Sequence, residues 1–264
     1  MNNPRTVHCA SKYANAVQDV TNRGKCTFVL NRPLTVPPEY EMHVSVLSAT
    51  IPFSFYSIPS SVAFQFVGGA VWATISPGNW SAYDVATLLT VAGTIAVTYV
   101  WETGLFSFKN NSATSFTLPI NNILGTLNTK VVASGATVVG DIIPDIAGTR
   151  FINVLSTLNT QCITTGTTSA GSGVLISLPV NCAPNGFIQF APQNLVRNKL
   201  SETYINTFDI TICDSNMQPL NLHGCDFELD LLVETVIPIG ENPKYNEAPV
   251  QDSLFDSVRN YKRK

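Results

Sequence analysis

Charged residues are scarce in this sequence of 264 residues. Asp, Glu, Lys and Arg make up 12% of the chain and apolar residues make up 45%, whereas about a quarter of a typical globular protein is charged. The net charge of -3 offers no electrostatic footprint for specific nucleic-acid binding, because phosphate binding needs clustered Lys and Arg. So few charges favour a surface that other subunits cover. A secreted β protein rich in Ser, Thr and Asn would show the same composition.

Motifs of the common enzyme classes are also missing. The chain contains no G-x-S-x-G, no G-x-x-x-x-G-K-[ST], no H-E-x-x-H and no G-x-G-x-x-G. His8, His43 and His223 are scattered, without the H-x-H spacing that loads a metal into a β-barrel. We therefore expect no enzyme activity, no catalytic residue, no cofactor and no bound metal.

The cysteines form no recognisable framework. Six of them lie far apart, with no C-x-x-C pair: Cys9, Cys26, Cys162, Cys182, Cys213 and Cys225. The first residues hold no apolar run, so we expect no secretory leader. Buried, reduced thiols are then the main prediction, with a Cys213–Cys225 disulfide as the alternative. No apolar run reaches the roughly 18 residues of a membrane helix, so we expect no membrane span.

Residues 204–237 carry the clearest strand pattern. Apolar and polar residues alternate twice, around Phe208 and Ile210 and again around Leu229 and Leu231, as in half-buried strands. A polar loop with Pro219 separates the two runs, so the pattern predicts an antiparallel pair of strands. Asp226, Glu228 and Asp230 then share one face, which is typical of a wet face or a subunit rim. A cation site is the less favoured alternative.

Two local patterns stand out before residue 100. Phe53, Phe55 and Tyr56 lie between Pro52 and Pro59, in a break between strands. Such aromatic residues either plug the end of a sandwich or anchor a subunit contact. The capping-box spacing of Ser81 and Asp84, followed by an apolar stripe that ends at Gly93, predicts one short helix at residues 81–92.

The whole pattern predicts an all-β protein. About ten short strand candidates, one helix and no internal repeat favour a sandwich of two antiparallel sheets. We expect a Gly68-Gly69 hairpin and a long Thr/Ser/Gly-rich loop at residues 157–173. The predicted organisation is an N-terminal arm at 1–25, one domain at 26–237 and a C-terminal tail at 238–264, both termini being extended and reaching toward neighbouring subunits.

Three stretches together resemble a known family. They are I-P-F-S-F-Y at residues 51–56, P-G-N-W at residues 77–80, and L-N-L-H-G at residues 220–224 with Phe227 after it. In this order they are similar to motifs of the penton (vertex) capsid proteins of virophages, polinton-like viruses and related large double-stranded DNA viruses. The resemblance implies a single jelly roll of two four-stranded sheets. It also implies a structural virion protein that forms homopentamers at the five-fold vertices of an icosahedral capsid, next to a double jelly-roll major capsid protein.

Three other functions stay open. One is another single jelly-roll minor capsid protein, which would cement the faces of the capsid. Another is a carbohydrate-binding β-sandwich for attachment, with Trp72, Trp80 or Trp101 as a stacking platform. A cupin-like metal enzyme is the third. Under the penton interpretation, the expected subunit-interface residues are Phe53, Phe55, Tyr56, Asp226, Glu228 and Asp230.

Overall fold

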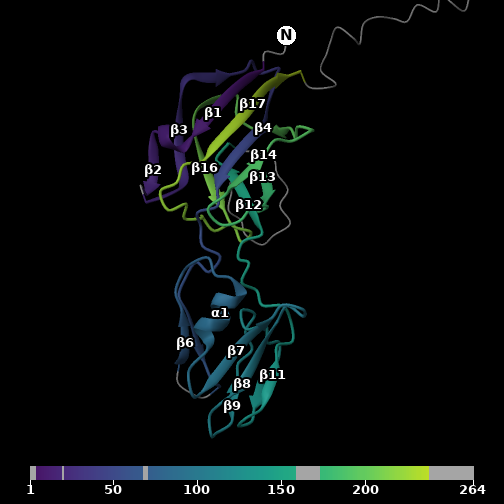
Figure 1. Cartoon of the computed structure of the whole chain (residues 1–264). Coiled ribbons are helices and arrows are strands. Elements are labelled where there is room, and N and C mark those ends of the chain that lie inside the picture. Colours follow the sequence, from purple (N-terminus) through teal and green to yellow (C-terminus); the bar gives the residue numbers. More distant parts are fainter. Residues whose placement is uncertain (1–3, 20, 68–70, 159–172, 238–264) are drawn as a thin grey trace, which may run out of the picture.

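The computed structural model describes residues 4–19, 21–67, 71–158 and 173–237, which form two lobes (Figure 1). The buried apolar residues form two corresponding clusters. One cluster draws on residues 9–55 and 152–233, and the other on residues 58–132. We call the first the sandwich lobe and the second the inserted lobe, because the chain leaves the sandwich lobe, builds the inserted lobe and returns.

The sandwich lobe consists of two antiparallel sheets. The first has the order β1, β17, β4 and β14, with β15 also paired to β4; the bounds are β1 Arg5–Ala10, β17 Glu228–Val236, β4 Glu41–Pro52, β14 Phe187–Phe190 and β15 Asn198–Lys199. The second has the order β13, β12, β16, β3 and β2; the bounds are β13 Gly173–Pro179, β12 Phe151–Ser156, β16 Tyr204–Cys213, β3 Asn22–Thr35 and β2 Ala16–Asp19.

The chain path through these sheets is that of a jelly roll. Leaving aside the short strands β2 and β15, eight strands remain, and the chain crosses between the sheets at every step except from β12 to β13. All neighbouring pairs are antiparallel. Eight strands wound in this way form a jelly roll, so the predicted fold class is confirmed.

The pairing of β16 with β17 that we expected is wrong. The strands themselves are where the pattern placed them, but β16 pairs with β3 and β12, whereas β17 pairs with β4 and β1. Their apolar faces, with Ile210 on β16 and Leu231 on β17, contribute to one core from opposite sheets. Alternation shows only that a strand buries one face, and a sandwich satisfies that condition as well as a hairpin does.

The N-terminal residues are also different from the expected arm. β1 pairs along its length with β17, from Arg5 opposite Val233 to Ala10 opposite Glu228. After the 3-10 turn Ser11–Tyr13, β2 pairs with β3. Residues 5–19 therefore supply the first strand of the jelly roll and extend its second sheet. Their apolar pattern is short because β1 buries only one face and lies at the edge of its sheet.

The inserted lobe lies between β4 and β12. Its elements are β5 Val62–Gln65, β6 Val71–Ile75, α1 Ala82–Leu89, β7 Ile95–Val100, β8 Leu105–Asn110, β9 Phe116–Leu118, β10 Lys130–Val132 and β11 Thr137–Val139. They form a three-stranded sheet (β11, β8, β7) and two two-stranded sheets. A core of its own sets this lobe apart, which differs from the single domain expected over residues 26–237. The expected Gly68-Gly69 turn lies outside the described residues, as does most of the expected 157–173 loop.

The helix α1 begins as the sequence predicts and ends earlier. Ser81 and Asp84 form the full capping box, and Val85, Ala86 and Leu89 are buried. The helix stops after Leu89 because Thr90 is extended and the next residue, Val91, bridges to Ile95 through a turn that contains Gly93 at φ 75°.

Two connecting segments join the lobes and lie against one another. Gly148 has φ 66°, and a Cβ atom placed there would lie 2.6 Å from the Cα atom of Ser57. Ser57 is also held by the side chain of Asn79, whose amide oxygen accepts its backbone N–H at 2.7 Å. Glycine is therefore required at position 148, both for its backbone conformation and for this close approach.

Candidate functional site

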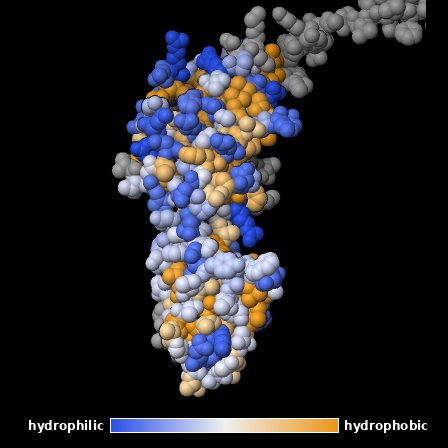
Figure 2. Space-filling model, in the orientation of Figure 1, coloured by the Kyte–Doolittle hydropathy of each residue, from blue (hydrophilic) through white to orange (hydrophobic). Residues whose placement is uncertain are grey.

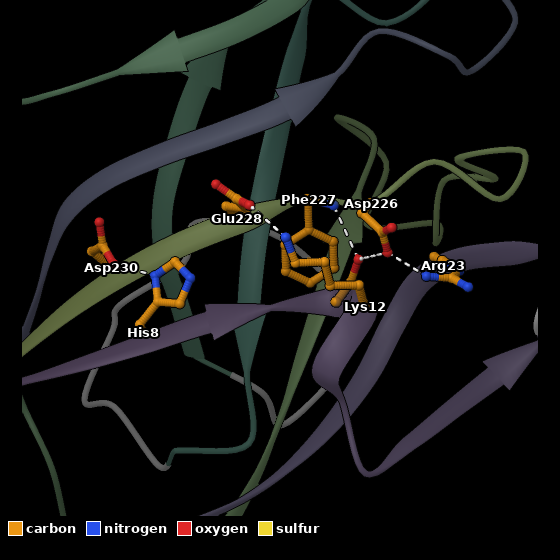
Figure 3. A network of polar contacts seen from close by, with 8 residues as sticks. His8, Lys12, Arg23, Asp226, Phe227, Glu228 and Asp230 are labelled. Atoms are coloured by element: carbon orange, nitrogen blue, oxygen red, sulfur yellow. Dashed lines mark hydrogen bonds and ion pairs between the residues drawn. The ribbon is translucent and has the colours of Figure 1, made fainter.

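Asp226 forms the centre of a polar contact between the N-terminal residues and the start of β17 (Figure 3). Its carboxylate accepts a hydrogen bond of 2.7 Å from the Ser11 hydroxyl and forms an ion pair with Arg23. The Ser11 hydroxyl also accepts the backbone N–H of Phe227 at 3.0 Å. Ser11 is buried, so these bonds supply the partners that a polar group without access to water needs.

The next two acids of the row have partners of their own (Figure 3). Glu228 pairs with Lys12 at 3.5 Å. Asp230 pairs with the His8 ring at 2.7 Å and accepts a hydrogen bond of 2.6 Å from the Ser48 hydroxyl. All three acids thus have partners within the chain, chiefly from residues 8–23. These partners are remote in sequence, so no local pattern predicts them.

The arrangement around Asp230 does not activate a nucleophile. Hydrogen bonds from Ser48 first, and then from His8, hold the pKa of Asp230 below its usual value. In a catalytic Ser-His-Asp triad, histidine lies between serine and the acid and takes the proton of serine. Here the acid lies between Ser48 and His8, so among the described residues the histidine is bonded to the acid and not to the serine hydroxyl.

The cysteines in the described residues are free thiols. Burial raises the pKa of Cys9 and Cys213 to about 12 and that of Cys26 to about 11. Thiols with such pKa values are poor nucleophiles at neutral pH, since the thiolate is the reactive form. Cys213 and Cys225 are both free, so the alternative of a disulfide between them is wrong.

Neither a metal cluster nor a membrane helix is found in the part of the chain that the structure describes. No group of three or more His, Cys, Asp or Glu side chains lies close enough to hold a metal ion there. Among the described residues, no helix combines the length and the apolar character that crossing a bilayer requires. Asp226, Glu228 and Asp230 lie in a row, but their carboxylates are directed to separate partners.

The aromatic break plugs the end of the sandwich. Phe53 and Phe55 are 6% and 2% exposed and belong to the core of the sandwich lobe. Their ring centroids lie 4.6 Å apart. Tyr56 is 38% exposed and packs on the ring of His223 at 4.3 Å. Of the three predicted interface aromatics, only Tyr56 presents appreciable surface to a second molecule.

A polar groove lies beside Tyr56, where the connecting segments pass between the lobes. Its volume is about 780 Å³. Pro77 lines it from the inserted lobe, and Asn216 and His223 line it from the loop that links β16 to β17. His223 is fixed by a hydrogen bond of 2.7 Å from Nδ1 to the carbonyl oxygen of Ser54. The groove is therefore shaped by both lobes.

The three tryptophans differ in exposure. Trp72 stacks on Phe66 with centroids 5.4 Å apart, and the Trp80 indole donates to the Ser76 carbonyl at 2.9 Å. Trp101 is 70% exposed, in the turn between β7 and β8. Only Trp101 has the free ring that a stacking platform needs.

Strand order and pairing define the class of this chain: a jelly-roll β-sandwich with a second lobe inserted between its third and fourth strands. No protein-family model matches the sequence, and no curated protein matches it either. Among solved structures, the crystal structure of the selenomethionine-labelled penton protein of mavirus is similar to it. The TM-score is 0.50 and the sequence identity is 12%, and the match covers 89% of this chain and 100% of the mavirus chain.

An identity of 12% establishes likeness of fold alone. The likeness of fold extends beyond the sandwich lobe, because the match covers 89% of this chain. The likeness to a penton protein agrees with the family that the three sequence motifs resemble.

Proposed function

We propose that this protein is a structural capsid subunit, a penton that assembles into homopentamers and closes the five-fold vertices of an icosahedral capsid. The observation that carries the proposal is the jelly roll with its inserted lobe, which a penton protein matches over its full length. The proposed partners are further copies of this chain and a double jelly-roll major capsid protein, and the proposed location is the virion. The proposed role is structural, not enzymatic.

The composition of the surface supports an assembled state. Figure 2 shows apolar and weakly polar residues on both lobes, and strongly hydrophilic residues are interspersed among them. Large exposed apolar side chains include Phe151 and Phe187 on the sandwich lobe and Val131 and Ile143 on the inserted lobe. Apolar surface of this kind is stabilised when a neighbouring subunit removes it from water.

A ring of five copies needs two different patches that fit one another, because its contacts are heterologous. We propose that Tyr56, Asp226, Glu228 and Asp230 lie in or beside one of these patches. The acids already hold β1 and the 3-10 turn against β17, so they also fix the shape of the surface that the neighbouring copy meets. Phe53 and Phe55 are left out, because their burial leaves them almost no surface.

The decisive experiment is the mass of the purified full-length protein in solution, followed by electron microscopy of the same sample. We expect particles with five times the mass of the 28.6 kDa chain and rings with five-fold symmetry. A protein that stays monomeric alone and with the major capsid protein would contradict the proposal. Assemblies on capsid faces without five-fold rings would favour the minor capsid protein.

A charge reversal tests the proposed patch. Glu228→Lys removes the surface ion pair with Lys12, which contributes little to stability, roughly 0–1 kcal/mol. It also replaces a negative charge with a positive one in the patch that we propose to contact the neighbouring copy. We expect fewer rings and a nearly unchanged melting temperature. Glu102→Lys, in the exposed turn between β7 and β8, is the matched control and should assemble as the wild type does.

The exposure of Trp101 favours one second candidate, attachment to carbohydrate. An exposed indole ring can stack on the apolar face of a sugar. A glycan array with wild-type protein and Trp101→Ala distinguishes the candidates: binding that the variant loses supports attachment, and no binding by the wild type removes it.

A further inference from the structure

An open groove is lined by Arg5 at the start of β1 and by Val233 and Thr235 near the end of β17. The start of β1 and the end of β17 lie at the end of the sandwich lobe away from the inserted lobe (Figure 1). Two adjoining hollows form the groove, of about 230 and 420 Å³. Both are lined by Arg5 of β1 and Leu34 of β3. The groove therefore follows the open side of the sandwich, between one edge of each sheet.

The floor of the groove is apolar and its rim is basic. Apolar lining residues come from four strands (β1, β3, β4 and β17) and from the turn after β3: Val7, Leu30, Leu34, Val36, Met42 and Val233. Arg5 and Arg32 are exposed at the rim. Neither forms an ion pair with any residue that the structure describes. The site therefore fits a segment with large apolar side chains and negative charge.

The strands on either side of the groove have unpaired edges. Within the part of the chain that the structure describes, β1 is the end strand of its sheet and pairs only with β17. Among the described strands, β2 pairs with β3 only as far as Thr27, and beyond Val29 β3 pairs only with β16, at Leu34 and Thr35. Unpaired backbone N–H and C=O groups are available along both strands, and an extended segment can pair with such an edge.

The chain itself contains a segment with the required chemistry beyond the described residues. Residues 247–258, E-A-P-V-Q-D-S-L-F-D-S-V, hold three acids and no base, together with Val250, Leu254, Phe255 and Val258. β17 ends at Val236, and Val233 and Thr235 of this strand line the groove. The eleven residues from 237 to 247 span up to about 36 Å when extended, so the segment reaches the groove from where β17 ends.

We propose that residues 247–258 dock in the β1–β3 groove of their own chain, with Leu254 and Phe255 in the hollows and Asp252 and Asp256 next to Arg5 and Arg32. Docking on the same chain is favoured over docking on another copy because a short tether gives a high effective concentration, on the order of millimolar. The docked segment covers the apolar floor and the free edges. This inference is independent of the capsid role.

The test is a photo-crosslink in the full-length chain. A benzophenone amino acid replaces Phe255, and the crosslinked peptides are identified by mass spectrometry. We expect crosslinks to β1 or to residues 30–36, within chains of monomer mass. The same probe at Tyr261, outside the segment, is the control and should not label the groove. Crosslinks spread over other surfaces would overturn the proposal.

Mixing isotopically heavy and light copies distinguishes the source of the segment. Docking on the same chain gives only heavy–heavy and light–light crosslinks. Mixed crosslinks would show that the tail binds another copy, which contradicts docking in its own groove.

Charge reversal tests the recognition itself. We expect Arg32→Glu to lower the crosslink yield roughly fivefold, because it replaces an attraction with a repulsion. Adding Asp252→Arg and Asp256→Arg should restore the yield. Arg150→Glu changes another exposed arginine, which does not line the groove, and is the control. Since Arg32 is exposed, an unchanged melting temperature will show that the variant folds; an unchanged yield in that folded variant would overturn the proposed charge pairing.

Discussion

Single residues in this protein act mainly by fixing where segments meet. Asp230 is an example, since one carboxylate joins β17 to Ser48 on β4 and to His8 on β1. Gly148 is another, since the absence of a side chain lets the two connecting segments touch. Each makes a prediction that one substitution can test.

The low pKa of Asp230 couples stability to pH. Its folded-state pKa lies below the unfolded value, which is about 3.9 for Asp. The corresponding stability is therefore present above that pH and lost as the pH falls through the folded pKa. We expect the unfolding free energy of the wild type to fall more steeply than that of Asp230→Asn below about pH 4, as measured by urea denaturation at several pH values.

Ser48→Ala provides the intermediate case for this experiment. It removes the hydrogen bond that lowers the pKa of Asp230 most and leaves the carboxylate in place. Its pH dependence should lie between those of the wild type and Asp230→Asn. Equal slopes for all three proteins would show that Asp230 does not contribute.

Gly148→Ala tests the close approach of the connecting segments. Both Gly148 and Gly135 have positive φ, but nothing lies within 4 Å of a Cβ placed on Gly135. Gly135→Ala therefore costs only backbone strain, on the order of 1 kcal/mol, whereas Gly148→Ala adds a clash with the backbone of Ser57. We expect Gly148→Ala to lower the unfolding free energy by roughly 1–3 kcal/mol more than Gly135→Ala. Equal losses in urea denaturation would mean that the segments move apart freely.

At the scale of elements, the N-terminal strand matters most. β1 contributes the buried residues Cys9 and Ala10, and its hydrogen bonds to β17 complete the first sheet. An arm that bound only to neighbours would be dispensable for the fold of one subunit. An integral strand is not.

Deleting residues 1–20 should therefore destabilise the isolated protein. The deletion exposes the outer edge of β17 and leaves Asp226 and Asp230 without Ser11 and His8. We expect the melting temperature to fall by about 10 °C or more, measured by circular dichroism. Deleting residues 1–4, which precede β1, is the control and should change it little. An unchanged melting temperature after the longer deletion would favour the arm.

At the scale of the whole molecule, the two lobes bury separate cores. The segments that connect them meet at Ser57 and Gly148, so the sandwich lobe has its entry and exit points for the insertion close together. Insertions at such adjacent points are tolerated because the host fold closes without them.

Removing the inserted lobe should leave the jelly roll folded. The test replaces residues 58–147 with a short glycine linker between Ser57 and Gly148, which keeps Phe53 and Phe55 in the sandwich core. We expect a cooperative thermal transition and a dispersed amide spectrum in nuclear magnetic resonance. A protein without cooperative unfolding would show that the lobes depend on one another for stability.

Several features could be predicted from the sequence because they depend on local chemistry. The period of two around Ile210 and Leu231 determined that both segments are strands with one buried face. Ser81 and Asp84 determined where the helix begins, since a capping box involves only residues three apart. The position of Phe53 and Phe55 in a break between strands left two roles open, a plug or a subunit contact, and their burial in the sandwich core favours the plug.

Other features were decided only by the tertiary structure, because they depend on contacts between residues far apart in the chain. The sequence did not determine that β16 and β17 belong to opposite sheets, because alternation is the same in a hairpin and in a sandwich. Nor did it determine that Ser11, Lys12 and His8 bind the acids at residues 226–230, since these partners are more than 200 residues away. The pairing of β1 with β17 placed residues 5–10 in the jelly roll. Long-range packing also divided the buried residues into two separate cores.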